Sequence, residues 1–461
     1  MRILLGSLLL LPAVAAAQPT PDPTAPSEPP PVAAPPAEVA PPPAPLYDDA
    51  KVNALIDARL AAQKPVAGWK DGFIIQTADG KTKLKVGAIL QFDNRTFIED
   101  SAGTHTDQFS FRSIRPDLQA TLFDHFDLRL MPDFAGGKLV VQDAYTDVRY
   151  SDVVKVRFGK FKVPFGLERL QGETNTLFAE RGLPTQLAPN RDLGVQVFGE
   201  IAKGTLAYQV GVFNGVADGA SGDGDVSDGK EGAARIFVKP FAQSGNHLLA
   251  ELGAGGAVTY GQKNGTLASP DVSIFKTQAS TTFFSLATGT TLADTVVADG
   301  HHWRATGQAS YYAGPVGLLG EYVRSAEKIA LGGDGETLTT ESWQAVAQYV
   351  LTGDAATYKS VAPDHPLDPD KGQWGAFDVA ARIGELRIVD TDIFRDKFAD
   401  LTKSATRVWS AGIGLNWYAN KNFRIAIDYE RTWFRRGAKD GTTAVDRPDE
   451  SGFVGRVQTA F

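Results

Sequence analysis

The chain has 461 residues, no cysteine and a formal net charge of −8 at pH 7. The absence of cysteine excludes a disulfide scaffold and thiolate metal sites, and the acidic balance argues against nucleic acid as a partner. Beyond the N-terminus, no stretch approaches the roughly 18 consecutive apolar residues of a membrane-spanning helix. If the protein crosses a membrane, it must therefore do so as a closed β-barrel, because only helices and closed sheets satisfy their own backbone hydrogen bonds in lipid.

Three short segments precede the main body of the chain. Residues 1–17 have the charged, apolar and small-residue order of a secretory signal peptide. Residues 18–46 are rich in Pro and Ala, which predicts an extended periplasmic tether without a core. Residues 47–64 predict a short periplasmic amphipathic helix that packs on another copy of the chain or on the barrel rim, or that has no role. Its apolar residues recur at helical spacing: Val52, Leu55, Ile56 and Leu60.

From residue 72 to residue 461 the sequence alternates repeatedly between apolar and polar residues. Segment 423–434 is a clear example, because the polar Arg424 and Asp428 share one strand face and the apolar Ile425 and Ile427 share the other. One face suits lipid and the other water, as in transmembrane strands. We therefore predict an all-β fold, a transmembrane antiparallel β-barrel of about 16 strands with a water-filled channel. The other candidate strands are 83–93, 114–122, 126–130, 139–150, 153–159, 193–202, 205–213, 233–239, 247–260, 303–313, 316–326, 341–351, 374–388, 407–417 and the last twelve residues.

The remaining polar stretches predict extracellular loops, and no standard metal-binding spacing occurs in them. They are 217–231, 262–300, 328–340, 353–372, 389–404 and 435–451. The chain ends on Phe461, preceded by Val457 and Phe453 at alternate positions. Such an end resembles the strand by which bacterial barrel-assembly machinery recognises its clients. We therefore expect the outer membrane of a Gram-negative cell.

Residues 153–216 carry the most specific motifs of the chain. The motifs are Val156 to Glu168, Glu180-Arg181, Arg191 to Gln196 and Gly211 to Gly215. They resemble those of the phosphate-selective porin O and P family, and the likeness extends over about residues 81 to 216. The resemblance implies a homotrimer of 16-stranded barrels in contact with membrane lipid and lipopolysaccharide. It also implies a loop that folds into the lumen and presents cations to small anionic solutes such as phosphate.

Six basic residues are candidates for this constriction. Arg169 and Arg181 fall where the family carries its basic loop residues. The other four precede them in a stretch that contains one acid: Lys155, Arg157, Lys160 and Lys162. A locally basic pore with walls of low dielectric constant focuses anions. Alternatively, these charges only line water or pair with nearby carboxylates, Glu168, Glu173 and Glu180. Further guanidinium groups are candidates for the wall of the lumen: Arg304, Arg324, Arg382, Arg387, Arg407, Arg424 and Arg456.

The predicted function is passive diffusion of small hydrophilic solutes through an outer-membrane porin, without a cofactor. Phosphate specificity stays open, because Gly172 and Glu173 stand where a phosphate-binding family member has small hydroxyl residues, and an acid opposes a dense anion site. One alternative is a non-conducting adhesin or structural barrel. Another is a barrel lipase, but no nucleophile motif accompanies the six histidines, so an enzyme is not expected.

Overall fold

The computed structural model describes residues 48–98, 106–225 and 227–461, so the predicted signal peptide and tether lie outside the described residues. Helix α1 (Asp49–Gln63) occupies the segment expected to be helical. The carboxylate of Asp48 accepts a hydrogen bond from the Lys51 N–H at 3.3 Å, as an N-cap residue does. No helix in the described part of the chain is both long and apolar enough to cross a membrane.

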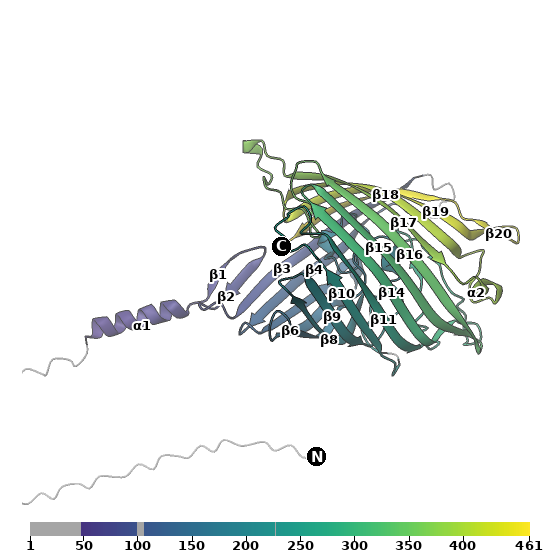
Figure 1. The fold of residues 1–461 in the computed structure, drawn as a ribbon, viewed down its shortest axis with the longest axis horizontal. Coiled ribbons are helices and arrows are strands. Elements are labelled where there is room, and N and C mark those ends of the chain that lie inside the picture. The colour runs from purple at the N-terminus through teal and green to yellow at the C-terminus, as the bar shows by residue number, and fades with distance from the viewer. Residues whose placement is uncertain (1–47, 99–105, 226) are drawn as a thin grey trace, which may run out of the picture. The chain divides into compact units, whose positions relative to one another are not determined.

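Sixteen strands form a closed antiparallel barrel, which confirms the predicted fold (Figure 1). Each strand pairs with the next, and the last pairs with the first to close the sheet. The barrel strands are β3 (Lys83–Ile98), β4 (Gln108–Leu122), β5 (Phe126–Asp133), β6 (Val140–Arg149), β7 (Lys155–Lys162), β8 (Arg191–Ile201), β9 (Leu206–Phe213), β10 (Glu231–Val238), β11 (Gly253–Asn264), β14 (Val297–Ala313), β15 (Val316–Leu331), β16 (Asp334–Val350), β17 (Ala376–Ile388), β18 (Ala405–Asn420), β19 (Phe423–Asp440) and β21 (Glu450–Ala460).

Short strands extend this barrel at both ends. The hairpin of β1 (Val66–Trp69) and β2 (Phe73–Gln76) pairs with the start of β3, so the barrel wall itself begins at Lys83. At the opposite end β20 (Thr443–Asp446) pairs with β19. The backbone N–H and C=O of Phe461 bond to Ala88 at 3.1 and 3.0 Å, which continues the seam between the last strand and the first. We call the end of the barrel that contains Phe461 the turn end and the opposite end the loop end.

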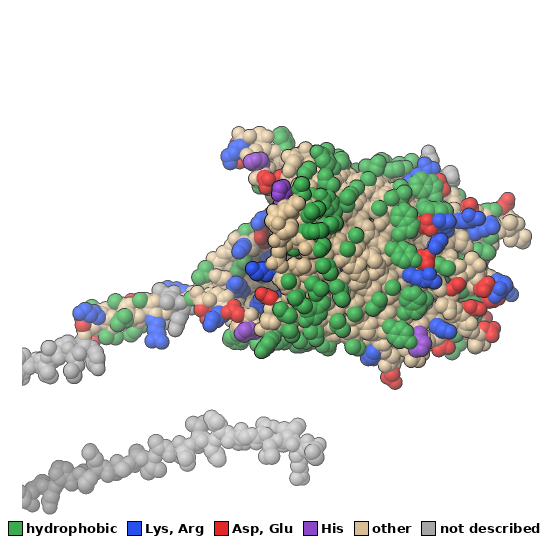
Figure 2. Space-filling view, in the orientation of Figure 1, with side chains coloured by type: hydrophobic (Ala, Val, Ile, Leu, Met, Phe, Trp, Pro, Cys, Tyr) green, Lys and Arg blue, Asp and Glu red, His purple; other side chains and the backbone are tan. Residues whose placement is uncertain are grey.

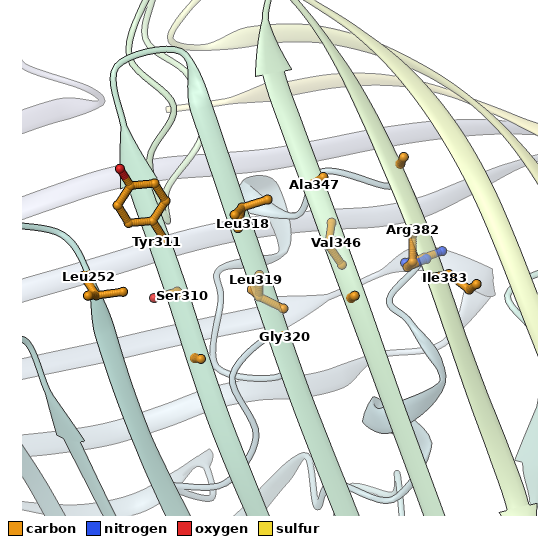
Figure 3. Close-up of a pocket in the computed structure, with 13 residues that line it drawn as sticks. Leu252, Ser310, Tyr311, Leu318, Leu319, Gly320, Val346, Ala347, Arg382 and Ile383 are labelled. Carbon is orange, nitrogen blue, oxygen red and sulfur yellow. The ribbon is translucent and has the colours of Figure 1, made fainter. Parts of the chain in front are cut away.

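The barrel strands alternate between the two faces as the sequence predicts. In β3, Leu90 and Phe92 are exposed on the outer face, whereas Gln91 and Asp93 are fully buried in the interior. Figure 2 shows hydrophobic side chains covering much of the barrel wall, with charged side chains gathered toward the ends. Between β11 and β17 small residues leave a shallow apolar hollow in this wall, rimmed by Leu318 and other large side chains (Figure 3).

Inside the loop end, three connecting segments fold onto the inner wall and form an apolar cluster. They are 163–190, 265–296 and 389–404. The second contains β12 (Phe275–Lys276) and β13 (Thr282–Phe284), and its phenylalanines are almost completely buried. Part of the predicted loop 262–300 is therefore a packed element of the interior, because its aromatic residues find an apolar surface there.

Two other predicted extracellular loops are placed differently by the structure. Residues 328–340 are mostly strand, since β15 and β16 continue to a tight turn at Gly332 and Gly333. Residues 351–375 join β16 to β17 at the turn end, where the Ala356 N–H bonds to Gly314 O at 2.8 Å and the Leu367 N–H to Ala419 O at 2.6 Å. The prediction of an extracellular loop at 353–372 was wrong. Successive antiparallel strands are connected alternately at the two ends of the barrel, so the position of a connection in the strand order, and not its polarity, decides the end at which it lies.

Candidate functional site: the constriction of the lumen

The loop of residues 163–190, between β7 and β8, lies inside the barrel and is attached to the opposite wall. Guanidinium groups of three inner-face arginines donate to its backbone carbonyls: Arg382 to Glu180 O, Arg424 to Thr176 O and Arg456 to Ala179 O. The loop approaches the wall closely at Gly182, where a Cβ atom would lie 1.8 Å from the Gln344 side-chain oxygen. The sequence suggested these arginines only as wall residues, and in the structure they also anchor the loop.

Carboxylates of the same loop also bind the wall. Glu180 lies 2.6 Å from Arg95 and 3.1 Å from Arg112, and Glu173 contacts Arg112 and Arg115. Burial alone would raise the pKa of Glu173, but Arg112 and Arg115 outweigh it and hold the pKa well below its usual range. Glu173 is thus an ionised and paired carboxylate, and its negative charge is compensated locally.

The turn-end segment 351–375 contacts this loop from within the lumen. The Tyr358 hydroxyl donates to Leu167 O, and the Gln171 side-chain amide donates to Tyr358 O at 2.9 Å. Tyr358 is half-buried and lines the same cavity as Leu170. Two segments from opposite ends of the barrel therefore meet and narrow the lumen at one level.

Beside the loop lies a luminal cavity of about 450 Å³. Its lining contains six cationic side chains and two carboxylates, together with aromatic residues such as Tyr145 and Phe161. The carboxylates are Asp143 and Glu173. The six cations are Arg115, Arg129, Arg157, Lys162, Arg191 and Arg235.

Four of these cations are paired with carboxylates. The ion pairs are Arg115 with Asp133 at 2.7 Å, Arg129 with Asp117 at 2.8 Å, Arg157 with Asp147 at 2.6 Å and Arg191 with Asp143 at 2.8 Å. Arg157 also lies over the Tyr145 ring, 3.8 Å from its centroid. Such pairs largely cancel at a distance, so they add little to the field that a passing ion experiences.

The other two cations of the cavity bind neutral oxygens. Lys162 donates to Arg169 O at 2.8 Å and to Gln171 O. Arg235 donates to the side-chain oxygens of Gln308 and Gln209 at 3.1 and 3.3 Å. Within the described ranges, no carboxylate lies within ion-pair distance of Lys162 or Arg235. Neither side chain therefore has a carboxylate partner among the described residues at the cavity wall.

The structure separates the six basic residues proposed from the sequence. Lys162 and Arg157 line the cavity, whereas Arg169 and Arg181 bind backbone carbonyls inside the loop: Arg169 binds Thr185 O, and Arg181 binds Glu168 O and Gln171 O. Lys160 is buried against Asp223. Lys155 lies at the turn end of β7, 3.9 Å from Asp152. Seven residues of strand, about 23 Å, separate it from Lys162.

Sequence reasoning did not single out Arg235. The signal was present, because Arg235 alternates with the exposed Ile236 in a short strand and so belongs to its inner face. Three other arginines that had been considered for the wall face outward near the loop end. Arg324, Arg387 and Arg407 pair with Glu341 or Glu385, and their side chains are between 36% and 50% exposed. They do not contribute to the lumen.

Comparison with known proteins gives consistent results. Residues 84–461 match the family described as "Phosphate-selective porin O and P". Porin O of Pseudomonas aeruginosa is 23% identical over 430 residues, which cover 85% of this chain and 91% of that protein. The outer membrane channel DcaP of Acinetobacter baumannii has a similar fold, with a TM-score of 0.53 at 13% identity over 86% of this chain and all of that one. An anion-selective porin from Comamonas acidovorans gives a TM-score of 0.51 at 13% identity over 82% and 100%.

Proposed function

This chain belongs to the phosphate-selective porin O and P family and is an outer-membrane channel; from that premise we propose that its lumen favours anions over cations. The observation that supports the preference is the set of cations without a carboxylate partner near the constriction. Lys162 and Arg235 lie at the cavity wall, and Arg169 and Arg181 lie behind it in the loop. In a narrow lumen with walls of low dielectric constant, such charges attract anions and repel cations.

The mechanism is passive diffusion through a fixed electrostatic field. The paired arginines shape the wall and hold the loop, and the unpaired cations set the sign of the potential. One unit charge about 10 Å from an ion changes its energy by roughly 1.7 kcal/mol at an effective dielectric constant of about 20. A few such charges are sufficient for a clear preference, and the solute needs no covalent chemistry.

The zero-current potential of single channels in a KCl gradient tests this function. We expect the wild-type potential to show preference for chloride, and Lys162→Met or Arg235→Gln to reduce the permeability ratio by up to about tenfold. Lys155→Met is the matched control, because it removes the same charge from the same strand far from the cavity. Preference for potassium in the wild type, or equal shifts in all three variants, would contradict the proposal.

The assembly that fits this channel is a homotrimer in contact with lipid and lipopolysaccharide, with the N-terminal segment in the periplasm. The family likeness supports the trimer, and the exposed apolar outer face supports the lipid contact. Native electrophoresis of the detergent-extracted protein, before and after heating, measures the oligomeric state. A monomer before heating would contradict the trimer without affecting the channel.

A further inference from the structure

Glu173 lies on two guanidinium groups at the edge of the luminal cavity. Its Oε1 is 3.4 Å from Arg112 Nη1, and its Oε2 contacts Arg115 Nη1. The two arginines come from β4, on which they are three residues apart. Glu173 and Arg115 both line the cavity, although the Glu173 side chain is only 9% exposed. The carboxylate is therefore fixed in the wall of the solute pathway.

This arrangement has the chemistry of an oxyanion bound to protein. Guanidinium donors match the oxygens of a carboxylate or a phosphate. Each arginine also has a second carboxylate on its Nε: Asp133 at 2.7 Å for Arg115 and Glu180 at 3.1 Å for Arg112. The two Nη1 groups directed at Glu173 are thus the donors that a solute anion would use if this side chain were absent.

We propose that the Glu173 carboxylate fills an oxyanion site formed by Arg112 and Arg115, and that Glu173 thereby prevents the channel from holding the anions it passes. This inference rests on the proposed anion preference. A tethered carboxylate competes with a free solute at a high effective concentration. Conduction requires that binding be weak enough for release, so an occupied site favours throughput over retention.

The site can be vacated without detaching the loop from the wall. Arg382, Arg424 and Arg456 hold the loop through its backbone carbonyls, and none of them contacts Glu173. Substitution of Glu173 leaves these anchors in place. Arg112 and Arg115 then each lack one carboxylate partner, and Arg115 lines the cavity.

The experiment compares phosphate block of chloride current in planar bilayers for the wild type and Glu173→Ala. We expect Glu173→Ala to be blocked at a phosphate concentration about tenfold lower than the wild type, because charged hydrogen bonds become available to phosphate. The stronger phosphate block should disappear in the double variant Glu173→Ala/Arg112→Gln. Glu180→Ala is the matched control, since it removes the same charge from the same loop and also frees Arg112, but Glu180 does not line the cavity.

Several results would overturn the inference. Block that is unchanged in Glu173→Ala, or equally strengthened in Glu180→Ala, would show that no specific site was vacated. Glu173→Ser provides a second test if the alanine variant does not assemble, and failure of both to assemble would make Glu173 a structural tie instead. The wild-type zero-current potential distinguishes the proposed anion preference from the proposed Glu173 site. Potassium preference would contradict both proposals. Chloride preference, with phosphate block unchanged in Glu173→Ala, would contradict only the Glu173 site.

Discussion

Most cations of the inner barrel wall pair with carboxylates, whereas the two arginines of the inward loop 163–190 bind backbone carbonyls. On the wall, Arg157 and Arg456 lie directly across the ladder from Asp147 and Asp93, and each forms a two-contact ion pair. In the loop, Arg169 and Arg181 donate to backbone carbonyls. The presence of a basic residue in the lumen therefore does not establish its contribution to the field.

The difference has a physical cause. A strand satisfies its own backbone in the ladder, so inner side chains find partners in the side chains of the neighbouring strand. A loop without a ladder leaves carbonyl groups that need donors, and buried carbonyls must be paired. A neutral carbonyl does not cancel the charge of the cation that it binds. We therefore propose that the residues that fix the loop conformation also give the loop its positive potential.

Removal of a wall cation that also holds the loop should have the largest effect. Arg456→Met leaves Asp93 buried and unpaired and frees Ala179 O. We expect a loss of about 3–5 kcal/mol in the free energy of unfolding, as for a broken buried ion pair. Urea titration of the vesicle-folded barrel measures it. The outward-facing Arg324→Met is the control, with an expected change of about 0–1 kcal/mol.

Reversal of the loop cations should have the next largest effect. Arg169→Glu/Arg181→Glu places two negative charges beside the pathway, and we expect the zero-current potential in a KCl gradient to move from chloride toward potassium preference. The variant Arg169→Lys/Arg181→Lys separates charge from geometry, because it keeps the sign and loses the guanidinium fork. If both variants shifted the potential equally, loop conformation and not charge would be responsible.

Removal of a complete wall pair should change selectivity much less than removal of one unpaired cation. Arg157→Gln/Asp147→Asn deletes both members of a pair, so we expect the zero-current potential to stay within a few millivolts of wild type. Lys162→Met, which removes one charge without a carboxylate partner, is the comparison. A larger shift for the double variant would show that paired charges also set the field.

Mild acid should have the smallest effect on the loop. Arg112 and Arg115 hold the pKa of Glu173 below its usual range despite burial, so this ion pair stabilises the loop above the unfolded pKa and is lost only as pH falls through the lower folded value. We expect the zero-current potential to change by the same amount between pH 7 and about pH 4.3, the ordinary value for a glutamate, in the wild type and in Glu173→Gln. A larger change in the wild type than in Glu173→Gln would mean that Glu173 titrates normally.

The strand pattern could be predicted almost completely from the sequence. The sixteen candidate segments each correspond to one barrel strand. Successive side chains of such a strand face lipid and water in turn, so the sequence alternates between apolar and polar residues with a period of two. Adjacent histidines follow the same rule: His301 stacks on Tyr260, whereas His302 is fully buried. The family likeness also predicted a loop folded into the lumen, with Arg169 and Arg181 among its residues, and the basic stretch before the loop made Lys162 a candidate.

The partner of each cation was decided only by the tertiary structure. Arg456 meets Asp93 across 363 residues of sequence, and Arg382 meets a loop carbonyl across 202. The turn-end segment that brings Tyr358 to the loop was assigned by its polarity to the wrong end of the barrel. Local alternation determines which face a side chain occupies, because that depends on its strand alone. Pairing and net field depend on barrel closure, which brings distant strands and loops within a few ångströms.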